Sequence, residues 1–255
     1  MPKFNSYHWK TTRLTDRELE AAREELMDPS SAAKRLEAFL VLLRSEQSAA
    51  IGIALDHYHY ATSRSRHGQA QPYTTHRGEV VERARDLLRH PPGPHDEIHG
   101  DFPGAEHASA LIVLANEAGD QDAGLVANAL DSASDFDTES AALQAAGRIF
   151  RWSDSPSADL IDRIARMVRD EDRDLDERLE ALEALARGKD PRLLYEIAEI
   201  TASDDVALQV TATHALAFHD MTTYRSLVEE RLASWPEDAP YPATEVRELL
   251  QDDGS

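Results

Sequence analysis

Apolar residues recur along most of this chain at the three- and four-residue spacing that places them on one face of an α-helix. No segment alternates convincingly at period two, the pattern of a half-buried strand. Ser, Thr or Asp precede many of these runs, where their oxygens can accept hydrogen bonds from the free N–H groups of a first turn. The pattern predicts an all-α chain. The expected helices span 16–27, 31–44, 46–60, 78–89, 104–118, 121–132, 138–152, 156–168, 175–187, 191–202, 205–218, 221–234 and 243–251.

Several helix starts and stops are marked by residues with a clear physical role. Thr15-Asp16-Arg17-Glu18 has the form of a capping box. Ser155-Pro156 and Asp190-Pro191 each place a capping residue before a proline at the first helical position, where the missing N–H costs nothing. Gly188 and Gly119 are expected to end the helices that precede them.

One apolar frame, which starts at an alanine, is repeated along the chain. The anchor residues are Ala38, Ala110, Ala142, Ala181 and Ala212. They are separated by 72, 32, 39 and 31 residues, so the first gap is about two repeats wide. Small side chains let neighbouring helices approach closely, and the Leu, Ile and Val residues that follow can fill the groove between them. Ala243, in the terminal helix, lies outside this frame and is expected at the surface.

The run Asp-Leu-Asp-Glu-Arg-Leu-Glu-Ala-Leu-Glu-Ala-Leu-Ala at 174–186 resembles the first-helix pattern of the HEAT-like, armadillo-type repeat family. The resemblance is clearest over residues 135–235, above all over 174–235, and it weakens before residue 135. It implies an α-solenoid, a right-handed superhelix of stacked antiparallel helix pairs, with a concave surface that usually binds protein. An unrelated globular helix bundle is the alternative.

Departures from the repeat suggest how the chain is organised. We expect an N-terminal segment with a capping helix at 1–30, a first helix pair at 31–60, and HEAT-like repeats at 104–235. Residues 61–103 depart from the pattern, either as a degenerate repeat or as an inserted helix with long loops. A C-terminal helix and tail occupy 236–255. All five parts are expected to form one continuous domain.

Charge and composition narrow the choice of partner and compartment. The chain has 48 acidic and 27 basic residues, a net charge of −21 that opposes binding to nucleic acid. It contains no cysteine, no apolar run long enough to cross a bilayer, and no signal-peptide pattern at its start. We therefore expect a cytoplasmic protein with no membrane partner.

Histidine is concentrated in one region, with eight of the eleven residues between positions 57 and 107. Imidazole beside carboxylate is a common metal-binding combination. The candidate metal ligands are His95, His99, Asp96 and His107, although the prolines and glycine around 91–100 argue against a zinc-binding helix and favour a solvated polar loop.

No catalytic or cofactor-binding residue can be assigned. The chain lacks a Gly-x-Ser-x-Gly elbow and a phosphate-binding Gly-rich loop, and paired carboxylates are too frequent in so acidic a sequence to single out an acid and a base. No cofactor is therefore expected.

Tyrosine and arginine, which are enriched at protein-binding hot spots, flank a locally basic linker at 61–77. Either Tyr58 or Tyr60 could instead pack inside. The candidate partner-binding residues are Tyr58, Tyr60, Arg64, Arg66, Tyr73 and Arg77.

Three functions are compatible with these patterns. The first is a bacterial-style protein-binding solenoid that acts as an adaptor, scaffold or regulatory subunit and has no catalytic activity. The second is an acidic immunity or inhibitor protein that occludes a basic toxin, because strong negative charge accelerates association with such a target. The third is a metal-dependent enzyme that uses the histidine-rich 57–107 region.

Overall fold

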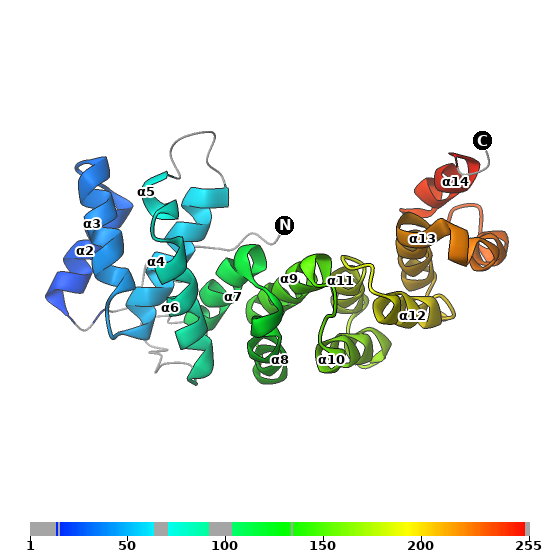
Figure 1. Ribbon diagram of the computed structural model, residues 1–255, viewed down its shortest axis with the longest axis horizontal. Coiled ribbons are helices and arrows are strands. Elements are labelled where there is room, and N and C mark those ends of the chain that lie inside the picture. The colour runs from blue at the N-terminus through cyan, green and yellow to red at the C-terminus, as the bar shows by residue number, and fades with distance from the viewer. Residues whose placement is uncertain (1–13, 15, 64–70, 92–103, 134, 253–255) are drawn as a thin grey trace. The chain divides into compact units, whose positions relative to one another are not determined.

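The computed structural model describes residues 14, 16–63, 71–91, 104–133 and 135–252, and their regular structure is entirely helical (Figure 1). This confirms the all-α expectation. The helices are α2 (Arg17–Met27), α3 (Ala32–Leu43), α4 (Ser48–Ser63), α5 (Gln71–Thr74), α6 (Arg77–Arg89), α7 (Ala105–Glu117), η2 (Asp120–Asp122, a 3₁₀ turn), α8 (Ala123–Ser132), α9 (Phe136–Trp152), α10 (Ala158–Arg169), α11 (Leu175–Leu185), α12 (Pro191–Ile200), α13 (Val206–Ser234) and α14 (Ala243–Asp252).

Two features depart from the helices expected from the sequence. The one-turn helix α5 was not expected. The helices expected at 205–218 and 221–234 are the two halves of α13, which are separated only by a kink at Asp220 (φ −155°, ψ 67°). The Asp220 carboxylate accepts a hydrogen bond of 3.1 Å from the Thr223 N–H, so this residue caps the second half of α13.

The capping predictions have mixed outcomes. The cap of α2 is Asp16, whose carboxylate accepts the Glu18 N–H at 2.6 Å, whereas Thr15 lies outside the described residues. Asp190 caps α12, with Pro191 at its first position, as predicted. The prediction for Ser155-Pro156 is wrong, because α10 begins only at Ala158.

The chain divides into two compact units. Unit 1 comprises Met1–Ala118 and Gly124–Ala145, and unit 2 comprises Gly119–Ala123 and Ala146–Ser255. The division therefore falls inside α9. The five segments expected from the sequence stay a prediction.

Helices α4 and α7 form the interior of unit 1. Every residue from Ala50 to Leu55 in α4 and from Ala105 to Leu114 in α7 is buried. Helix α4 packs on α2, α3, α5, α6 and α7, and α6 also packs on α7. A helix that is apolar all round requires neighbours on every side, which explains the central place of these two.

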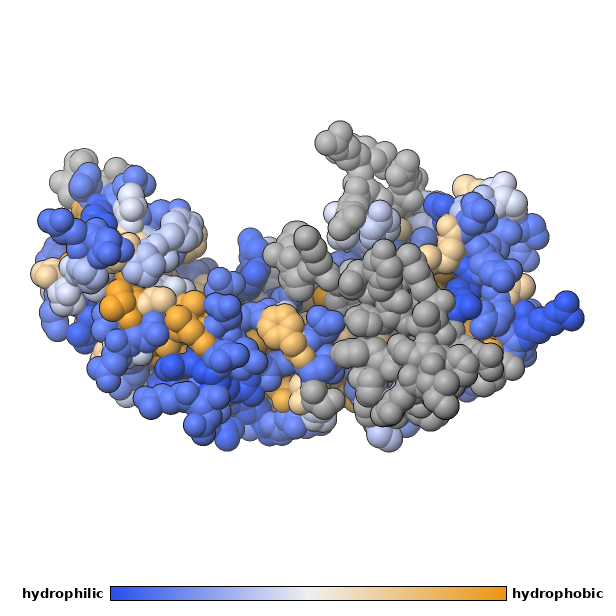
Figure 2. Space-filling model, turned by 180° about the vertical axis from the view of Figure 1, so that it is seen from behind, coloured by the Kyte–Doolittle hydropathy of each residue, from blue (hydrophilic) through white to orange (hydrophobic). Residues whose placement is uncertain are grey.

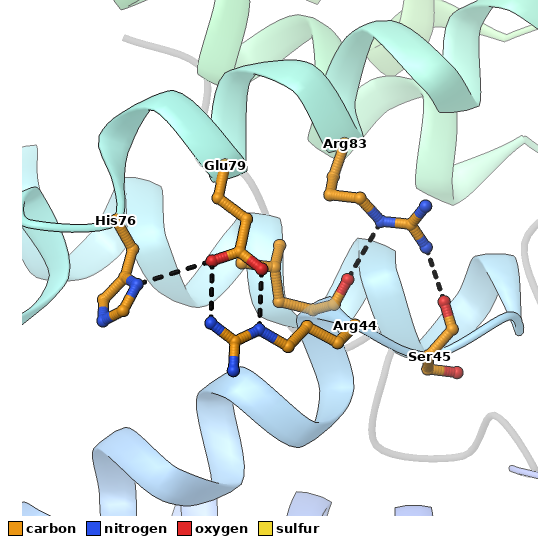
Figure 3. A network of polar contacts seen from close by, with 6 residues as sticks. Arg44, Ser45, His76, Glu79 and Arg83 are labelled. Carbon is orange, nitrogen blue, oxygen red and sulfur yellow. Dashed lines mark hydrogen bonds and ion pairs between the residues drawn. The ribbon is translucent and has the colours of Figure 1, made fainter.

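Two arginines tie the end of α3 to α6 in unit 1 (Figure 3). Arg44 makes a bidentate ion pair with Glu79, with N···O distances of 2.7 and 3.0 Å. Arg83 donates to the backbone carbonyls of Leu43, at 3.1 Å, and Ser45, at 2.5 Å. Carbonyls at a helix end have no partner within the helix, so Arg83 satisfies acceptors that α3 leaves open.

In unit 2, each helix from α10 to α14 contacts the helix next to it in the sequence, and some also contact the helix after that. Helix α10 packs on α11 and α12, α11 and α12 both pack on α13, and α13 packs on α14. The connections at 170–174, 186–190 and 201–205 are five residues each. Connections this short make consecutive helices run antiparallel.

Two close contacts define one edge of unit 2, which we call the turn edge. A Cβ atom on Gly188, just after α11, would lie only 2.7 Å from the Phe150 carbonyl oxygen in α9. The His219 ring nitrogen Nε2, at the end of the first half of α13, lies 2.7 Å from the Ala186 carbonyl oxygen. The turn edge therefore holds the carboxyl ends of α9, α11 and the first half of α13, and Gly188 is needed for the close approach of α9.

The anchor alanines lie in helix–helix contacts, as predicted. Ala38, Ala110, Ala142, Ala181 and Ala212 are all at most 4% exposed. The expectation for Ala243 is wrong: it is fully buried, in a cluster with Val210, Met221, Val228, Trp235 and Val246. The terminal helix α14 covers this apolar surface of α13, so position 243 belongs to the core.

We predict that Ala212→Leu lowers the free energy of unfolding by roughly 1–3 kcal/mol, because added methylene groups overpack a site with no free volume. Ala233→Leu is the matched control: Ala233 is exposed in the last turn of the same helix, and surface substitutions usually change stability by less than about 0.5 kcal/mol. Urea denaturation of both variants provides the comparison. Equal losses in the two variants would contradict the packing role of Ala212.

Candidate functional site

The residues expected to bind a partner or a metal lie partly outside the described residues, and those that are described have different environments. Two candidate partner residues, Arg64 and Arg66, lie outside the described residues, as do the candidate metal ligands His95, Asp96 and His99. The remaining candidates lie on α4, α5, α6 and α7, and their environments differ.

The Tyr58 and Tyr73 side chains are buried, at 3% and 7% exposure, so neither ring is accessible to a partner. The alternative left open for Tyr58, that it packs inside, is the one observed. Tyr60, two residues further along α4, is 56% exposed, so its ring is accessible to a partner. The exposed guanidinium of Arg77 donates a 2.7 Å hydrogen bond to the Glu117 carboxylate in α7.

His57 and Tyr73 form part of an aromatic cluster with Phe39. The His57 Nε2 lies 3.1 Å from the Tyr73 hydroxyl, and the Tyr73 ring packs edge-on against both His57 and Phe39, with centroids 5.2 Å apart in each pair. Burial, together with the nearby charge of Arg35, lowers the pKa of His57 to about 4. His57 is therefore neutral near pH 7 and joins α4 to α5 as a packed, hydrogen-bonded ring.

Asp56, the neighbour of His57 in α4, is largely buried. Its carboxylate makes no hydrogen bond or ion pair with any described residue. Burial raises the pKa of Asp56 to about 6, because the charged form loses its hydration without gaining a partner. The group is an unfavourable buried charge at neutral pH.

His107 is buried in the first turn of α7, and its Nε2 has no hydrogen-bond partner in the part of the chain that the structure describes. Within the same part, no three His, Asp or Glu side chains are arranged to hold a metal ion. Nor does any described helix have the length and apolar character needed to cross a membrane.

Unit 2 has an open groove of about 290 Å³ between α10 and α12, which we call the α10–α12 groove. It is lined by Ala158, Ile161, Asp162, Pro191, Arg192, Tyr195 and Glu196. Most of the lining surface is apolar. The Arg192 guanidinium donates to the Pro156 carbonyl oxygen at 2.8 Å, which holds the amino end of α12 against the start of α10.

Three charged side chains surround the apolar floor of this groove. Arg192 pairs with the Asp190 carboxylate, at 3.1 Å, and Glu196 pairs with Arg169, at 2.6 Å. Asp162 is exposed, and its carboxylate has no ion-pair partner among the described residues. The groove therefore carries one carboxylate without an ion-pair partner, with the Arg166 guanidinium 3.3 Å from the backbone carbonyl oxygen of the same residue.

Four aromatic side chains that were not candidates from the sequence are exposed in unit 2. Trp152, Tyr195, Phe218 and Tyr241 are 64%, 61%, 68% and 77% exposed, and the Tyr241 hydroxyl donates to the Glu245 carboxylate at 2.7 Å. Trp152 and Phe218 belong to the turn edge, where α9 and the first half of α13 end. The guanidinium carbons of Arg148 and Arg151 lie 5.3 and 5.4 Å from the Trp152 ring centroid, within the range of cation–π attraction.

The signal that could have found these residues is positional. Trp152 and Phe218 occur at the last turns of their helices, after the apolar stripe has ended, where a large ring has no facing helix to bury it.

On the face shown in Figure 2, most side chains are hydrophilic, and hydrophobic side chains gather over unit 2, at the left.

Comparisons with known proteins provide the fold alone. No protein-family model matches the chain, and no curated protein matches it. Among solved structures, the chain is similar to an engineered protein whose crystal structure was determined by the Northeast Structural Genomics Consortium. The two share 16% sequence identity with a TM-score of 0.53, and the match covers 86% of this chain and 96% of that one.

We predict that Asp56→Asn stabilises the protein at neutral pH. The wild-type carboxyl is protonated in the folded state below about pH 6, so its cost appears as pH rises from the ordinary aspartate range, near 4, through about 6. The variant should therefore gain roughly 1–2 kcal/mol in unfolding free energy at pH 7.5 and little at pH 4.5. Urea denaturation at both pH values measures the difference, and an equal gain at both would contradict the buried-charge explanation.

Proposed function

We propose that this chain is a HEAT-like α-solenoid that binds another protein, as an adaptor, scaffold or regulatory subunit, without catalytic activity of its own. The observation that carries the proposal is the α10–α12 groove, an open apolar surface in unit 2 with the exposed Tyr195 in its lining. Tyrosine is among the residue types enriched at protein interfaces, so this lining suits contact with a protein.

The repeat interpretation is supported by the helix contacts of unit 2. In a stack of helix pairs, each helix touches its own partner and the equivalent helix of the next pair. The contact of α11 with its partner α12, and the contacts of α10 with α12 and of α11 with α13, follow this rule. The buried anchor residues Ala181 and Ala212 occur at equivalent positions of α11 and α13.

The first gap between anchor alanines is compatible with a degenerate repeat. Two repeats would require one further helix pair between α4 and α7, and the described residues of that stretch form α5 and α6. The four-residue α5 stands where the first helix of that pair is expected. A shortened first helix would explain why residues 61–103 lose the alanine frame.

The protein-binding role is also supported by the residue types exposed on unit 2. Trp, Tyr and Arg are the residues that most often dominate binding energy at protein interfaces. Trp152, flanked by Arg148 and Arg151, and Tyr195 combine these types on unit 2.

A second candidate, an acidic inhibitor of a basic protein, is favoured by the connections opposite the turn edge. The connections that follow α10, α12 and α13 are rich in carboxylates. They contain Asp170, Glu171, Asp172, Asp174, Asp204, Asp205, Glu237 and Asp238. Binding through this edge would depend steeply on salt, because exposed charges are screened within about 8–10 Å at physiological ionic strength.

We predict that the full chain captures a stoichiometric protein partner from a lysate of its source organism, and that the double variant Trp152→Ala, Tyr195→Ala binds it at least about tenfold more weakly, as expected for loss of hot-spot residues. The matched control is Tyr60→Ala, which removes an exposed ring from unit 1. Quantitative pull-down followed by titration of the identified partner provides the measurement.

The pull-down distinguishes the proposed function, the location of the interface and the acidic-inhibitor candidate. Capture of no partner at any of several salt concentrations would contradict the proposed function. Loss of binding in Tyr60→Ala alone would instead locate the interface at the surface predicted from the sequence. Binding that disappears with added salt but tolerates the double variant would favour the acidic inhibitor.

A further inference from the structure

The shape of the α10–α12 groove limits the kind of ligand that it can hold. Its volume of about 290 Å³ is at the lower limit of small-molecule pockets, which enclose roughly 300–1,000 Å³. The groove is also partly open to solvent instead of enclosed. Both properties suit one or two side chains of a polypeptide that continues beyond the groove.

The walls of the groove select an apolar side chain. Ile161 on α10 and Tyr195 on α12 provide an aliphatic and an aromatic surface, and Ala158 and Pro191 add small apolar surfaces at the amino ends of the two helices. A large apolar side chain placed here would cover the exposed face of Tyr195. Burial of apolar area contributes about 25 cal/mol per Å², so one such residue can anchor a peptide.

The charges of the groove select a cation next to that anchor. Arg192 and Glu196 already have internal partners, Asp190 and Arg169 respectively. An incoming anion would have to displace the Asp190 carboxylate from Arg192. The Asp162 carboxylate is exposed and has no ion-pair partner among the residues described, so a Lys or Arg of the ligand can pair with it without displacing an internal partner. The Arg166 guanidinium, one turn further along α10, donates to the Asp162 backbone carbonyl at 3.3 Å and not to its carboxylate.

We infer, on the basis of the proposed function, that the α10–α12 groove binds a cationic segment of a partner protein, which seats one large apolar side chain against Ile161 and Tyr195 and pairs a Lys or Arg with Asp162. The excess of acidic residues in the whole chain, 48 against 27 basic, assists this choice by attracting basic segments. A second copy of this acidic chain is the less complementary occupant.

The test uses the full chain and a phage-displayed library of random 16-residue peptides. We expect the enriched peptides to contain a large apolar residue with Lys or Arg within four positions of it. The strongest binder is then synthesised and titrated by fluorescence anisotropy against the wild type and the variants. We expect Tyr195→Ala to weaken binding at least tenfold and Asp162→Asn to weaken it three- to tenfold.

Asp176→Asn is the matched control, because it removes the same charge from an exposed position at the amino end of α11, a helix that does not line the α10–α12 groove. This variant should change the affinity less than twofold. Circular dichroism of every variant checks that a loss of binding does not come from a loss of fold. The effect of Asp162→Asn should also shrink as salt is added, since an exposed ion pair is screened.

Three results would overturn the inference. Enriched peptides that are neutral or acidic, or an affinity unchanged by Asp162→Asn, would refute the cationic selection. Failure to enrich any peptide, while the lysate partner is still captured through Trp152 and Tyr195, would refute the linear segment and leave the proposed function standing. Concentration-dependent self-association that Tyr195→Ala abolishes would replace the partner with a second copy.

Discussion

The close approach of helices over small side chains is the constraint on which this structure depends. Ala181 and Ala212 are fully buried at helix contacts, and Gly188 has no space for even one further carbon beside Phe150. Because the backbones come this close, the larger side chains that follow each alanine reach across to the neighbouring helix and exclude water. The short connections of unit 2 follow from the same geometry, since helices in contact need few residues to join them.

Polar groups inside unit 1 modify this apolar framework in two opposite ways. His57 stays neutral in its cluster, so the folded state loses stability as pH falls from about 6.5 towards 4 and the unfolded chain takes up the proton first. The adjacent Asp56 acts in the reverse sense, because its folded form holds a proton up to about pH 6. The two contributions oppose each other between about pH 4 and 6, which flattens the dependence of stability on acidity.

Much of the local structure could be predicted from the sequence, because helix periodicity and caps are local signals. Asp190-Pro191 starts α12 where expected, and the alanine frame identified five buried contact positions. What depends on distant parts of the chain could not be predicted in this way. Ala243 is buried only because α14 folds back on α13, and Tyr73 is buried only because α5 brings it beside Phe39 and His57.

The candidate binding surface was missed for the same reason. Tyr58 and Tyr195 are both tyrosines within apolar helical runs, and nothing local distinguishes the buried ring from the exposed one. The difference is set by what faces each helix: α4 is surrounded on all sides, whereas α12 leaves part of its surface open beside α10. The binding surface was predicted in unit 1 because the linker there is rich in Tyr and Arg. Composition does not indicate which helix has a face that no other helix covers.

The kink at Asp220 also determines where the chain can change in length during evolution. A single non-helical residue joins the two halves of α13, whereas five residues join α10 to α11. An inserted residue at the kink would rotate one helix against the other by about 100°, one residue's share of a helical turn, and turn its apolar stripe away from the core. Insertions and deletions among descendants of this sequence should therefore accumulate at 170–174 and spare residue 220.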